Sequence, residues 1–327
     1  MPSSLPKKLD LAHLPTPIER CSPLDALVGT ECWIKRDDAT AGAEAGNKIR
    51  KLEYLLAEAL QQRATTVITC GGLQSNHARA TALLCRRLGL RPVLLLRTAA
   101  APNGREGNVL LDWLCGAELR FISHAQYAAR AELMVDVARE LEAGGERAYI
   151  IPEGGSNGLG ALGYREAMAE VRGQLDASRG LPEGFDAVVH ACGSGGTTAG
   201  LVLGAREHRV AEEVVAMAVC DDRAYFEARI ASILGEAERY EPAARQLARL
   251  RILDAYKGPA YGVASSEQLA FIRDVATACG LVLDPVYSGK ALFGLARMPD
   301  KPRRALFIHT GGLPGLLADH ARFDVLD

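Results

Sequence analysis

Residues 185–200 read FDAVVHACGSGGTTAG, an apolar and β-branched run that passes directly into a glycine-rich loop. The run predicts a buried strand, and the apolar residues that follow the loop predict a helix. Glycines let a ligand approach the backbone closely, and the N–H groups at the start of a helix bind anions. No lysine follows the glycines, which excludes the nucleoside-triphosphate loop. We therefore interpret Gly193–Thr198 as a phosphate site, with a simple strand-to-helix turn as the other reading.

Strand and helix patterns alternate on both sides of this loop. The alternation predicts an α/β fold built from parallel sheets with helices on both faces. A length of 327 residues favours two lobes with a cleft between them over one large sheet. We expect a large domain made of residues 1–47 and 161–327 and a small domain made of residues 48–160. The predicted strands are 65–70, 91–96, 118–122, 147–152, 185–192, 213–220 and 304–310.

A dinucleotide site is the main rival interpretation of the glycine-rich loop. Gly193 and Gly195 follow a strand, and the next strand runs into Asp221, where a ribose-binding carboxylate is expected. Thr198, however, stands where the third glycine or alanine of that fingerprint belongs. This alternative, an NAD-dependent oxidoreductase, also leaves two other polar loops unexplained.

The composition is that of a soluble globular protein. Hydrophobic residues make up 48% and charged residues 24% of the chain, and the net charge is −2 without a strongly basic block. This pattern argues against a nucleic-acid partner, and no apolar run reaches the length of a membrane span. The N-terminus lacks the apolar core of a signal peptide. The eight cysteines show neither a C-x-x-C pair nor zinc spacing, so we expect a reducing cytoplasmic compartment and no metal site.

A second polar loop, CGGLQSNHARAT at residues 70–81, also lies between a strand pattern and a helix pattern. Ser75 or Asn76 is expected to cap the helix, because both side chains accept hydrogen bonds from free N–H groups. The run of Gln, Ser, Asn and His offers more polar groups than one cap needs. A small carboxylate that binds Ser75 and the following N–H groups would use the same interaction.

The third stretch, AGNKIRKLEYLLAEALQQR at residues 45–63, predicts a helix with Lys48, Arg50 and Lys51 in its first turn. Cations are unfavourable there, because a helix N-terminus carries partial positive charge. With Asn47 as the N-cap, the helix end and the neighbouring cations would lower the pKa of Lys48. An unprotonated lysine is a nucleophile for carbonyl compounds. For Lys51 we expect an ordinary solvated position.

A phosphate site together with an activated lysine favours pyridoxal 5′-phosphate, a cofactor held through a Schiff base and an anion site. The last part of the chain adds Tyr261 and Tyr287, each of which is either a core aromatic or a site residue. The loop position of Tyr287 favours a site. Thr310 ends a predicted strand, at the edge of the sheet where ligands bind in α/β folds.

With these residues in view, the chain resembles the D-cysteine desulfhydrases and 1-aminocyclopropane-1-carboxylate deaminases, pyridoxal-phosphate enzymes of the tryptophan-synthase-β fold. The resemblance covers nearly the whole chain and implies fold type II, a small amino-acid substrate and a homodimer. One departure is Ala45, where the family usually has glycine. The motifs that carry the resemblance, in order, are HLPTPIER, IKRDD, GNKIRKLEYL, GGLQSNHARATA, PEGGSNGLGALGY, ACGSGGTTAGL, DPVYSGK and FIHTGG.

The resemblance assigns an expected role to each candidate residue. Lys48 is the lysine that forms the Schiff base with the cofactor and later removes the Cα proton. Asn76 is expected beside the phenolic oxygen of the cofactor, and Ser75 beside the substrate carboxylate. Tyr261 and Tyr287 correspond to the two tyrosines of the substrate pocket, where Tyr287 would steer or protonate the leaving group. The phosphate loop comprises Gly193, Ser194, Gly195, Gly196, Thr197 and Thr198.

Two positions divide the chemistries of this family. The cyclopropane deaminases carry a glutamate after the second tyrosine, facing the pyridine nitrogen, and here that residue is Ser288. The desulfhydrase-like members offer a hydroxyl from the last motif, here Thr310. A carboxylate keeps the nitrogen protonated and makes the ring a strong electron sink, whereas a hydroxyl suits the loss of a good β leaving group. Ser288 and Thr310 therefore predict β-elimination.

D-cysteine, converted to pyruvate, hydrogen sulfide and ammonia, is the expected substrate. Within the family, the alternatives are a cyclopropane deaminase and an L-cysteate sulfo-lyase, which shares the VYSGK and HTGG motifs. A protein that binds the cofactor without catalysing a reaction is a further alternative. The NAD-dependent oxidoreductase remains the rival from a different class.

Overall fold

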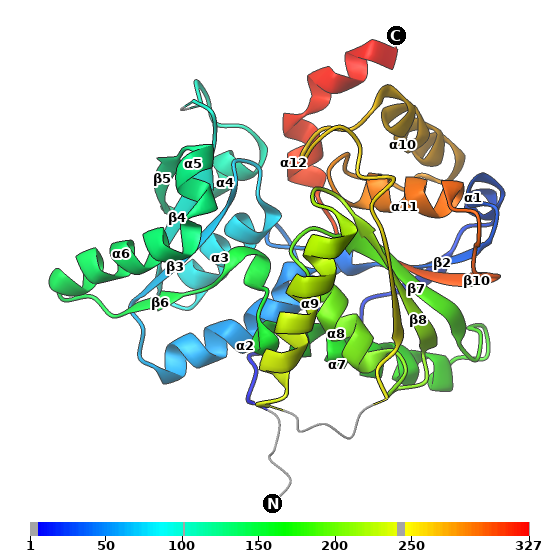
Figure 1. The fold of residues 1–327 in the computed structure, drawn as a ribbon, viewed down its shortest axis with the longest axis horizontal. Coiled ribbons are helices and arrows are strands. Elements are labelled where there is room, and N and C mark those ends of the chain that lie inside the picture. Colours follow the sequence, from blue (N-terminus) through cyan, green and yellow to red (C-terminus); the bar gives the residue numbers. More distant parts are fainter. Residues whose placement is uncertain (1–5, 101, 241–245, 327) are drawn as a thin grey trace, which may run out of the picture.

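The computed structural model describes residues 6–100, 102–240 and 246–326, which form two sheets (Figure 1). The larger sheet has the strand order β1-β2-β10-β7-β8-β9, and the smaller has the order β5-β4-β3-β6. Only β1 and β2 pair antiparallel among these described strands. The strands are Ile18–Arg20 (β1), Glu31–Lys35 (β2), Thr66–Gly72 (β3), Arg91–Arg97 (β4), Glu118–Ile122 (β5), Ala148–Ile150 (β6), Phe185–Cys192 (β7), Ala211–Ala218 (β8), Arg249–Leu253 (β9) and Arg304–Ile308 (β10).

Each predicted strand is present, with ends that differ by a few residues. Three further strands, β1, β2 and β9, were not predicted, and they lie toward the two edges of the larger sheet. These strands are short, and β1 and β9 expose most of their residues at least in part. They therefore lack the continuous apolar run that marks a strand buried on both faces.

Helices cover both faces of each sheet. One core cluster joins the larger sheet to α1, α10 and α11, and two others join it to α7, α8 and α9. The smaller sheet packs against α2 and α3 on one face and α5 and α6 on the other. The helices are Ser22–Val28 (α1), Lys48–Gln61 (α2), Asn76–Arg87 (α3), Gly107–Leu114 (α4), His124–Ala128 (α5), Arg130–Ala143 (α6), Gly158–Ala177 (α7), Gly196–Gly204 (α8), Arg223–Ala237 (α9), Ser266–Cys279 (α10), Ser288–Arg297 (α11) and Leu313–Ala318 (α12).

The two sheets come from different parts of the chain. All four strands of the smaller sheet lie within residues 66–150, and the larger sheet takes its strands from 18–35 and 185–308. The expected boundary at residue 48 coincides with the start of α2. The expected boundary at 160/161 falls inside α7, a helix whose first residues pack in the core of the smaller lobe. Figure 1 shows the two lobes side by side, with α12 beside the region between them.

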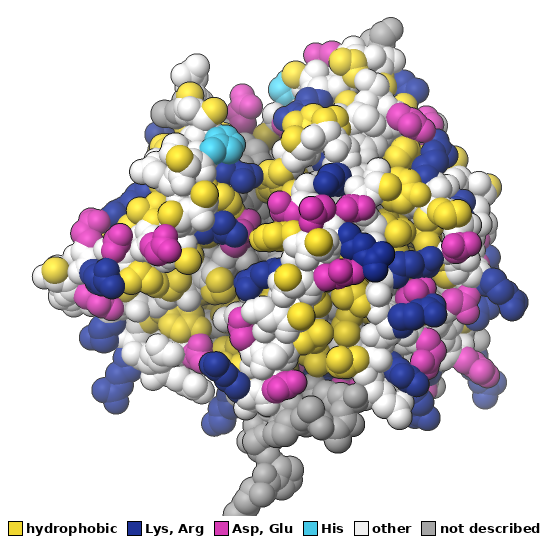
Figure 2. Space-filling view, viewed as in Figure 1, with side chains coloured by type: hydrophobic (Ala, Val, Ile, Leu, Met, Phe, Trp, Pro, Cys, Tyr) yellow, Lys and Arg dark blue, Asp and Glu magenta, His cyan; other side chains and the backbone are white. Residues whose placement is uncertain are grey.

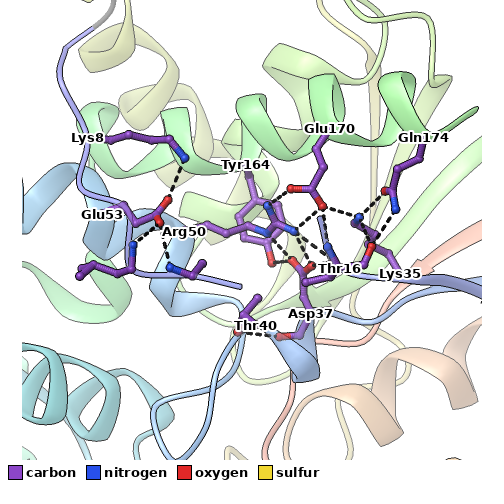
Figure 3. Close-up of polar contacts among 12 residues, drawn as sticks. Lys8, Thr16, Lys35, Asp37, Thr40, Arg50, Glu53, Tyr164, Glu170 and Gln174 are labelled. Carbon is purple, nitrogen blue, oxygen red and sulfur yellow. Dashed lines mark hydrogen bonds and ion pairs between the residues drawn. The ribbon is translucent and has the colours of Figure 1, made fainter. Parts of the chain in front are cut away.

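The end of β2 and the residues just after it are tied to α2 and α7 by a buried cluster of charges (Figure 3). Arg50 in α2 bonds to both Asp37 oxygens at 2.8 and 2.9 Å and to Glu170 in α7 at 2.8 Å. Lys35 reaches the same Glu170 at 2.5 Å, and Tyr164 donates to Asp37. Arg50 and Asp37 are 2% and 0% exposed, so their charges are compensated by each other rather than by water.

We expect Arg50→Met to be strongly destabilising, because it leaves the Asp37 carboxylate buried without its main partner. Breaking a buried ion pair in this way costs about 3–5 kcal/mol of unfolding free energy. Urea titration of the variant measures this loss. The matched control is Arg206→Met, which removes an arginine that is 43% exposed in its ion pair with Glu212. Equal small losses in the two variants would contradict the stabilising role of the cluster.

Candidate active site

One pocket brings together nearly all of the residues singled out in the sequence. Its lining residues come from both lobes, among them the first turns of α2, α3 and α8 and the loop that precedes α11. Figure 1 shows where these helices lie. Gly196 and Ser288 are the predicted site residues that do not line it. The predicted residues that do line it are Lys48, Ser75, Asn76, Gly193, Ser194, Gly195, Thr197, Thr198, Tyr261, Tyr287 and Thr310.

Lys48 begins α2 and places its amine in this pocket. The Lys48 Nζ donates to Asn47 Oδ1 at 2.9 Å and lies 5.8 Å from the centre of the Tyr287 ring. Removal from bulk water lowers the pKa of Lys48 to about 8, while Asp284 opposes this shift and Arg79 adds to it. A large share of the amine is therefore unprotonated near pH 8, and it is in a state that attacks carbonyl carbons.

The direction of this pKa shift agrees with the expectation from sequence, but its cause differs. The expected contribution of Arg50 to the lowered pKa of Lys48 is wrong, because the charge of Arg50 is compensated in the buried cluster with Asp37 and Glu170. Asn47 occupies the N-cap position without capping α2 through its side chain. Its amide instead donates to Thr197 Oγ1 at 3.1 Å, which connects the starts of α2 and α8.

Lys51 is not the solvated surface lysine that the sequence suggests. Its side chain is 1% exposed, and its Nζ donates to Gly154 O at 3.0 Å and to Ser156 Oγ at 3.4 Å. Burial, and secondly the charge of Lys48, lower the pKa of Lys51 well below its ordinary value. The ion pairs of the described residues leave Lys51 without a carboxylate partner, so this buried amine lacks a counter-anion.

The glycine-rich turn lies directly beside this amine. A Cβ atom on Gly196 would stand 2.9 Å from Lys51 Nζ and 2.6 Å from Ser156 Oγ. Burying an uncompensated charge is costly, whereas an anion at a helix N-terminus is favourable. The start of α8 together with Lys51 therefore fits a phosphate group, which would supply the missing negative charge. The residues present match the anion-binding half of a pyridoxal-phosphate site.

Two glycines of the turn have different structural roles. Gly195 has a φ of +85°, in the left-handed region that side chains rarely adopt, and it precedes the first residue of α8. A Cβ atom on Gly193 would stand 3.0 Å from Tyr287 Cε1, so Gly193 leaves room for the tyrosine ring. A Cβ atom on Gly195 would instead face α9.

The second predicted loop forms the wall contributed by α3. Ser75 caps this helix as expected, because its Oγ accepts from the Ala78 N–H at 3.1 Å. Asn76 follows as the first residue of α3, and its Oδ1 accepts from Asn108 Nδ2 at 3.1 Å. The pocket therefore meets the N-terminus of α3 through a serine and an amide, groups that suit a carboxylate and a phenolic oxygen.

Tyr261 and Tyr287 meet in the pocket as a hydrogen-bonded pair. Their hydroxyl oxygens are 2.7 Å apart, and the ring centres lie 6.2 Å apart in an edge-to-face arrangement. Burial raises the pKa of Tyr261 to about 12 and raises that of Tyr287 well above its ordinary value. Both hydroxyls therefore keep their protons at neutral pH and can donate them within the pocket.

Thr310 and Ser288, the two residues expected near the pyridine nitrogen, differ in position, because Thr310 lines the pocket and Ser288 does not. Thr310 lies two residues beyond β10 and lines the pocket. The Ser288 hydroxyl donates to Asp284 Oδ1 at 2.6 Å and accepts from the Asp284 N–H at 3.0 Å. Asp284 Oδ2 also accepts from the N–H groups of Val286 and Tyr287, so the serine and aspartate hold the loop that carries the catalytic candidate Tyr287.

Carboxylates are scarce at this site. Among the described residues that line the pocket, Glu153 is the one acidic side chain. Its oxygens are engaged by the Tyr127 hydroxyl and by Arg130, whose Nε lies 3.0 Å away. On the molecular face shown in Figure 2, basic and acidic side chains are interspersed, without a large area of one sign.

Sequence reasoning missed Lys51, Ser156 and Glu153 as neighbours of the site. Ser156 connects Lys51 to the glycine-rich turn, since it accepts from the Gly196 N–H at 3.2 Å and lies 2.8 Å from Ser194 Oγ. The segment PEGGSNG, which holds Glu153 and Ser156, was a signal that could have found them. It contains two adjacent glycines after a predicted strand, as the phosphate loop does.

The dinucleotide interpretation gains no support from this arrangement. Asp221 is exposed and does not line the pocket. The described histidine, cysteine and acidic side chains form no group of three that could hold a metal ion. In the same part of the chain, the helices are too short or too polar to span a bilayer.

The chain is similar to known proteins over nearly its whole length. The model of the family described as pyridoxal-phosphate dependent enzyme matches residues 9–311. The bifunctional D-cysteine desulfhydrase/1-aminocyclopropane-1-carboxylate deaminase of Arabidopsis thaliana is 45% identical over 318 residues, covering 94% of this chain and 78% of the relative. D-cysteine desulfhydrase of Serratia proteamaculans is 40% identical over 328 residues, covering 96% of both chains.

A solved structure described as a homologue of 1-aminocyclopropane-1-carboxylate deaminase superposes with a TM-score of 0.89 at 35% identity, covering 98% of this chain and 96% of the other. The expected family, the α/β fold with parallel sheets and the cofactor class are thereby confirmed. The chain belongs to the family of pyridoxal-phosphate dependent enzymes.

Proposed function

We propose that this enzyme eliminates the β-substituent of a small amino acid, and that D-cysteine is converted to pyruvate, hydrogen sulfide and ammonia. The observation that carries the proposal is that an activated Lys48 and Thr310 line the same pocket, whose one described acidic side chain, Glu153, is already engaged. The relatives that are named for acting on D-cysteine support the same choice.

Lys48 supplies the basic amine of the proposed reaction. When bound, pyridoxal phosphate withdraws electrons from the Cα atom of an attached amino acid and weakens its bond to hydrogen. Lys48 is the residue that we expect to hold the cofactor covalently and then to take the Cα proton. Its pKa of about 8 suits both tasks, because the amine must be unprotonated to attack a carbonyl carbon or to accept a proton.

The tyrosine pair supplies the acid. As the Cβ–S bond breaks, the bonding electrons leave with sulfur, and a proton from Tyr287 converts the thiolate to a neutral leaving group. Tyr261 donates or accepts at 2.7 Å and can replace that proton along the hydrogen bond. Water completes the conversion of the remaining three-carbon unit to pyruvate and ammonia.

The α3 end of the pocket is proposed to bind the carboxylate of the substrate and the phenolic oxygen of the cofactor. Ser75 and the first N–H groups of α3 would hold the substrate carboxylate, and Asn76 would contact the phenolic oxygen of the cofactor. Lys51 and the turn Gly193–Thr198 would hold the phosphate. Thr310 would face the pyridine nitrogen, and Ser288 would act indirectly through the Asp284 loop.

A cyclopropane deaminase is the second candidate, since the Arabidopsis relative is named for both activities. The residue that would distinguish it is the glutamate expected at position 288. The serine present here has no carboxylate. Its hydroxyl is buried and bonded to Asp284. Without that carboxylate the pyridine ring is a weaker electron sink, and opening a cyclopropane ring is correspondingly harder.

A panel of substrates tests the proposal. Purified enzyme loaded with the cofactor is given D-cysteine, L-cysteine, L-cysteate or the cyclopropane amino acid, and sulfide, sulfite and pyruvate or 2-oxobutanoate are measured. We expect D-cysteine to have a kcat/KM at least about 10-fold above the others, a typical discrimination for a shaped pocket. Equal turnover of the cyclopropane amino acid would refute the assignment. Activity on L-cysteate alone would replace the substrate, and no turnover would indicate a non-catalytic protein.

The cellular context is also a proposal. All eight cysteines are free, which supports a reducing compartment such as the cytoplasm. We propose a homodimer, supported by exposed apolar side chains on the neighbouring helices α4 and α12, among them Trp113, Leu114, Leu313 and Leu317. Light scattering should therefore give about twice the 34.9 kDa mass of the chain, and a mass of one chain would rule the dimer out.

A further inference from the structure

Asn108 lies just outside the pocket, on α4, and contacts the pocket residue Asn76. Its side chain is 0% exposed and its Nδ2 has two acceptors. One is the backbone oxygen of Gln74 at 2.9 Å, and the other is Asn76 Oδ1 at 3.1 Å. Asn108 itself does not line the pocket, and it lies outside the sequence motifs of the family.

The two hydrogen bonds together fix which way the Asn76 amide points. A backbone carbonyl can only accept a hydrogen bond, so the atom of Asn108 that faces Gln74 O must be the NH2 group. The second hydrogen of the same NH2 group faces Asn76, and it can be bound only by the oxygen of that amide. Asn76 Oδ1 is therefore bound to Asn108 outside the pocket, and the NH2 group of Asn76 is left to face the pocket.

Asn108 is itself held firmly. Its backbone N–H donates to Gln74 Oε1 at 2.8 Å, and Gln74 Nε2 donates to Glu106 O at 3.1 Å. The preceding Gly107 has a φ of +52°, and a Cβ atom there would stand 2.6 Å from Gln74 Oε1. The start of α4 is therefore held against the loop that leads into α3, and Asn108 has little freedom to turn.

The oxygen of the Asn108 amide makes no comparable contact. Asn108 Oδ1 is buried and has no hydrogen-bond partner among the described residues. Leaving a buried acceptor unpaired has a cost in stability. The side chain is therefore used for its donors and not for its acceptor.

We propose that Asn108 is a positioning residue that holds the Asn76 amide with its NH2 group toward the pocket, where it donates to an anionic oxygen of the cofactor. The proposal rests on the role proposed above for Asn76. A hydrogen bond to an anionic phenolic oxygen stabilises that oxygen without its proton, so Asn108 also influences the colour and the titration of the bound cofactor.

Asn108→Asp tests the proposal, because a carboxylate of nearly the same shape offers acceptors in place of donors. The Asn76 amide then turns its NH2 group toward the new carboxylate and presents its oxygen to the pocket, where it repels the anionic oxygen. We expect the dissociation constant for pyridoxal phosphate, measured by absorbance, to rise about 10-fold or more. The pH at which the visible absorption band changes should rise as well. Asn108→Ala, which loses the contact without reversing it, should have a smaller effect on both.

Two controls separate positioning from other causes. Asn103→Asp adds the same charge at an exposed position just before α4 and should leave the dissociation constant and the absorption band unchanged. In an Asn76→Ala background, Asn108→Asp should cause little further loss of affinity, because its intermediary is gone. Additive losses in the double variant would overturn the proposal, as would an unchanged absorption band in Asn108→Asp. These measurements need no substrate, so they stand apart from the test for D-cysteine.

Discussion

Lys48→Ala should remove nearly all turnover of D-cysteine while leaving the protein folded. The variant loses the nucleophile that we expect to hold the cofactor and the base that we expect to take the Cα proton. A general base contributes about 10²–10⁴-fold to a rate, so we expect kcat to fall by about 10³-fold or more. The site should still bind pyridoxal phosphate non-covalently, since Lys51 and the turn before α8 are unchanged.

Lys48→Arg sharpens this test, because arginine keeps a positive charge but cannot form the covalent bond at neutral pH. It should be as inactive as Lys48→Ala. The matched control is Lys301→Ala, which removes a lysine that donates to Val28 O away from the pocket and should retain activity. Rescue of Lys48→Ala by added methylamine would support the role as a base. Turnover near the wild-type rate in either Lys48 variant would refute the proposed mechanism.

Gly196→Val should severely weaken cofactor binding. The position has no space for a side chain, because its first carbon atom would stand 2.9 Å from Lys51 Nζ and 2.6 Å from Ser156 Oγ. The new side chain therefore displaces the buried amine and the serine that we expect to surround the phosphate. Hydrogen bonds to charged groups are worth about 1.5–3 kcal/mol each, so loss of one or two raises the dissociation constant by about 100-fold.

Equilibrium dialysis against pyridoxal phosphate measures that change, and unfolding of the cofactor-free protein shows whether the fold is intact. The matched control is Gly173→Val in α7, where a Cβ atom meets nothing within 4 Å. It should not lower stability, because the helix has room for the side chain and glycine is the poorer helix former, and it should leave the dissociation constant as it is. An unchanged affinity in Gly196→Val would show that the turn is a connection between strand and helix and not an anion site.

Much of the fold was predictable because its main signals are local. Central parallel strands are buried on both faces and therefore appear as continuous apolar runs, of which β7 is the clearest example. The helix predicted within residues 45–63 is present as α2, and its apolar residues Ile49, Leu52, Leu55 and Leu56 are fully buried, although Leu60 is 37% exposed. The edge strands β1 and β9 lacked this signal.

The environment of a charged side chain was harder to predict, because it depends on segments far apart in the chain. Arg50 and Lys51 are adjacent and look alike as sequence, yet one enters a cluster with Glu170 and the other reaches Gly154. Neither partner lies within the helix that carries these cations. Ser288 was missed for a different reason: its partner Asp284 is only four residues away, and the local path of the backbone turns the hydroxyl toward it.

Reduction of the cofactor-loaded protein with borohydride, followed by mass mapping of its peptides, tests the central claim most directly. The reagent makes the covalent attachment of pyridoxal permanent and so records which amine carries it. We expect the modification on Lys48 alone, with loss of the visible absorption band. Lys51 is the informative competitor, because it is buried in the same region and its pKa is also lowered. Modification of Lys51, or a protein that carries no pyridoxal group after reduction, would contradict the account.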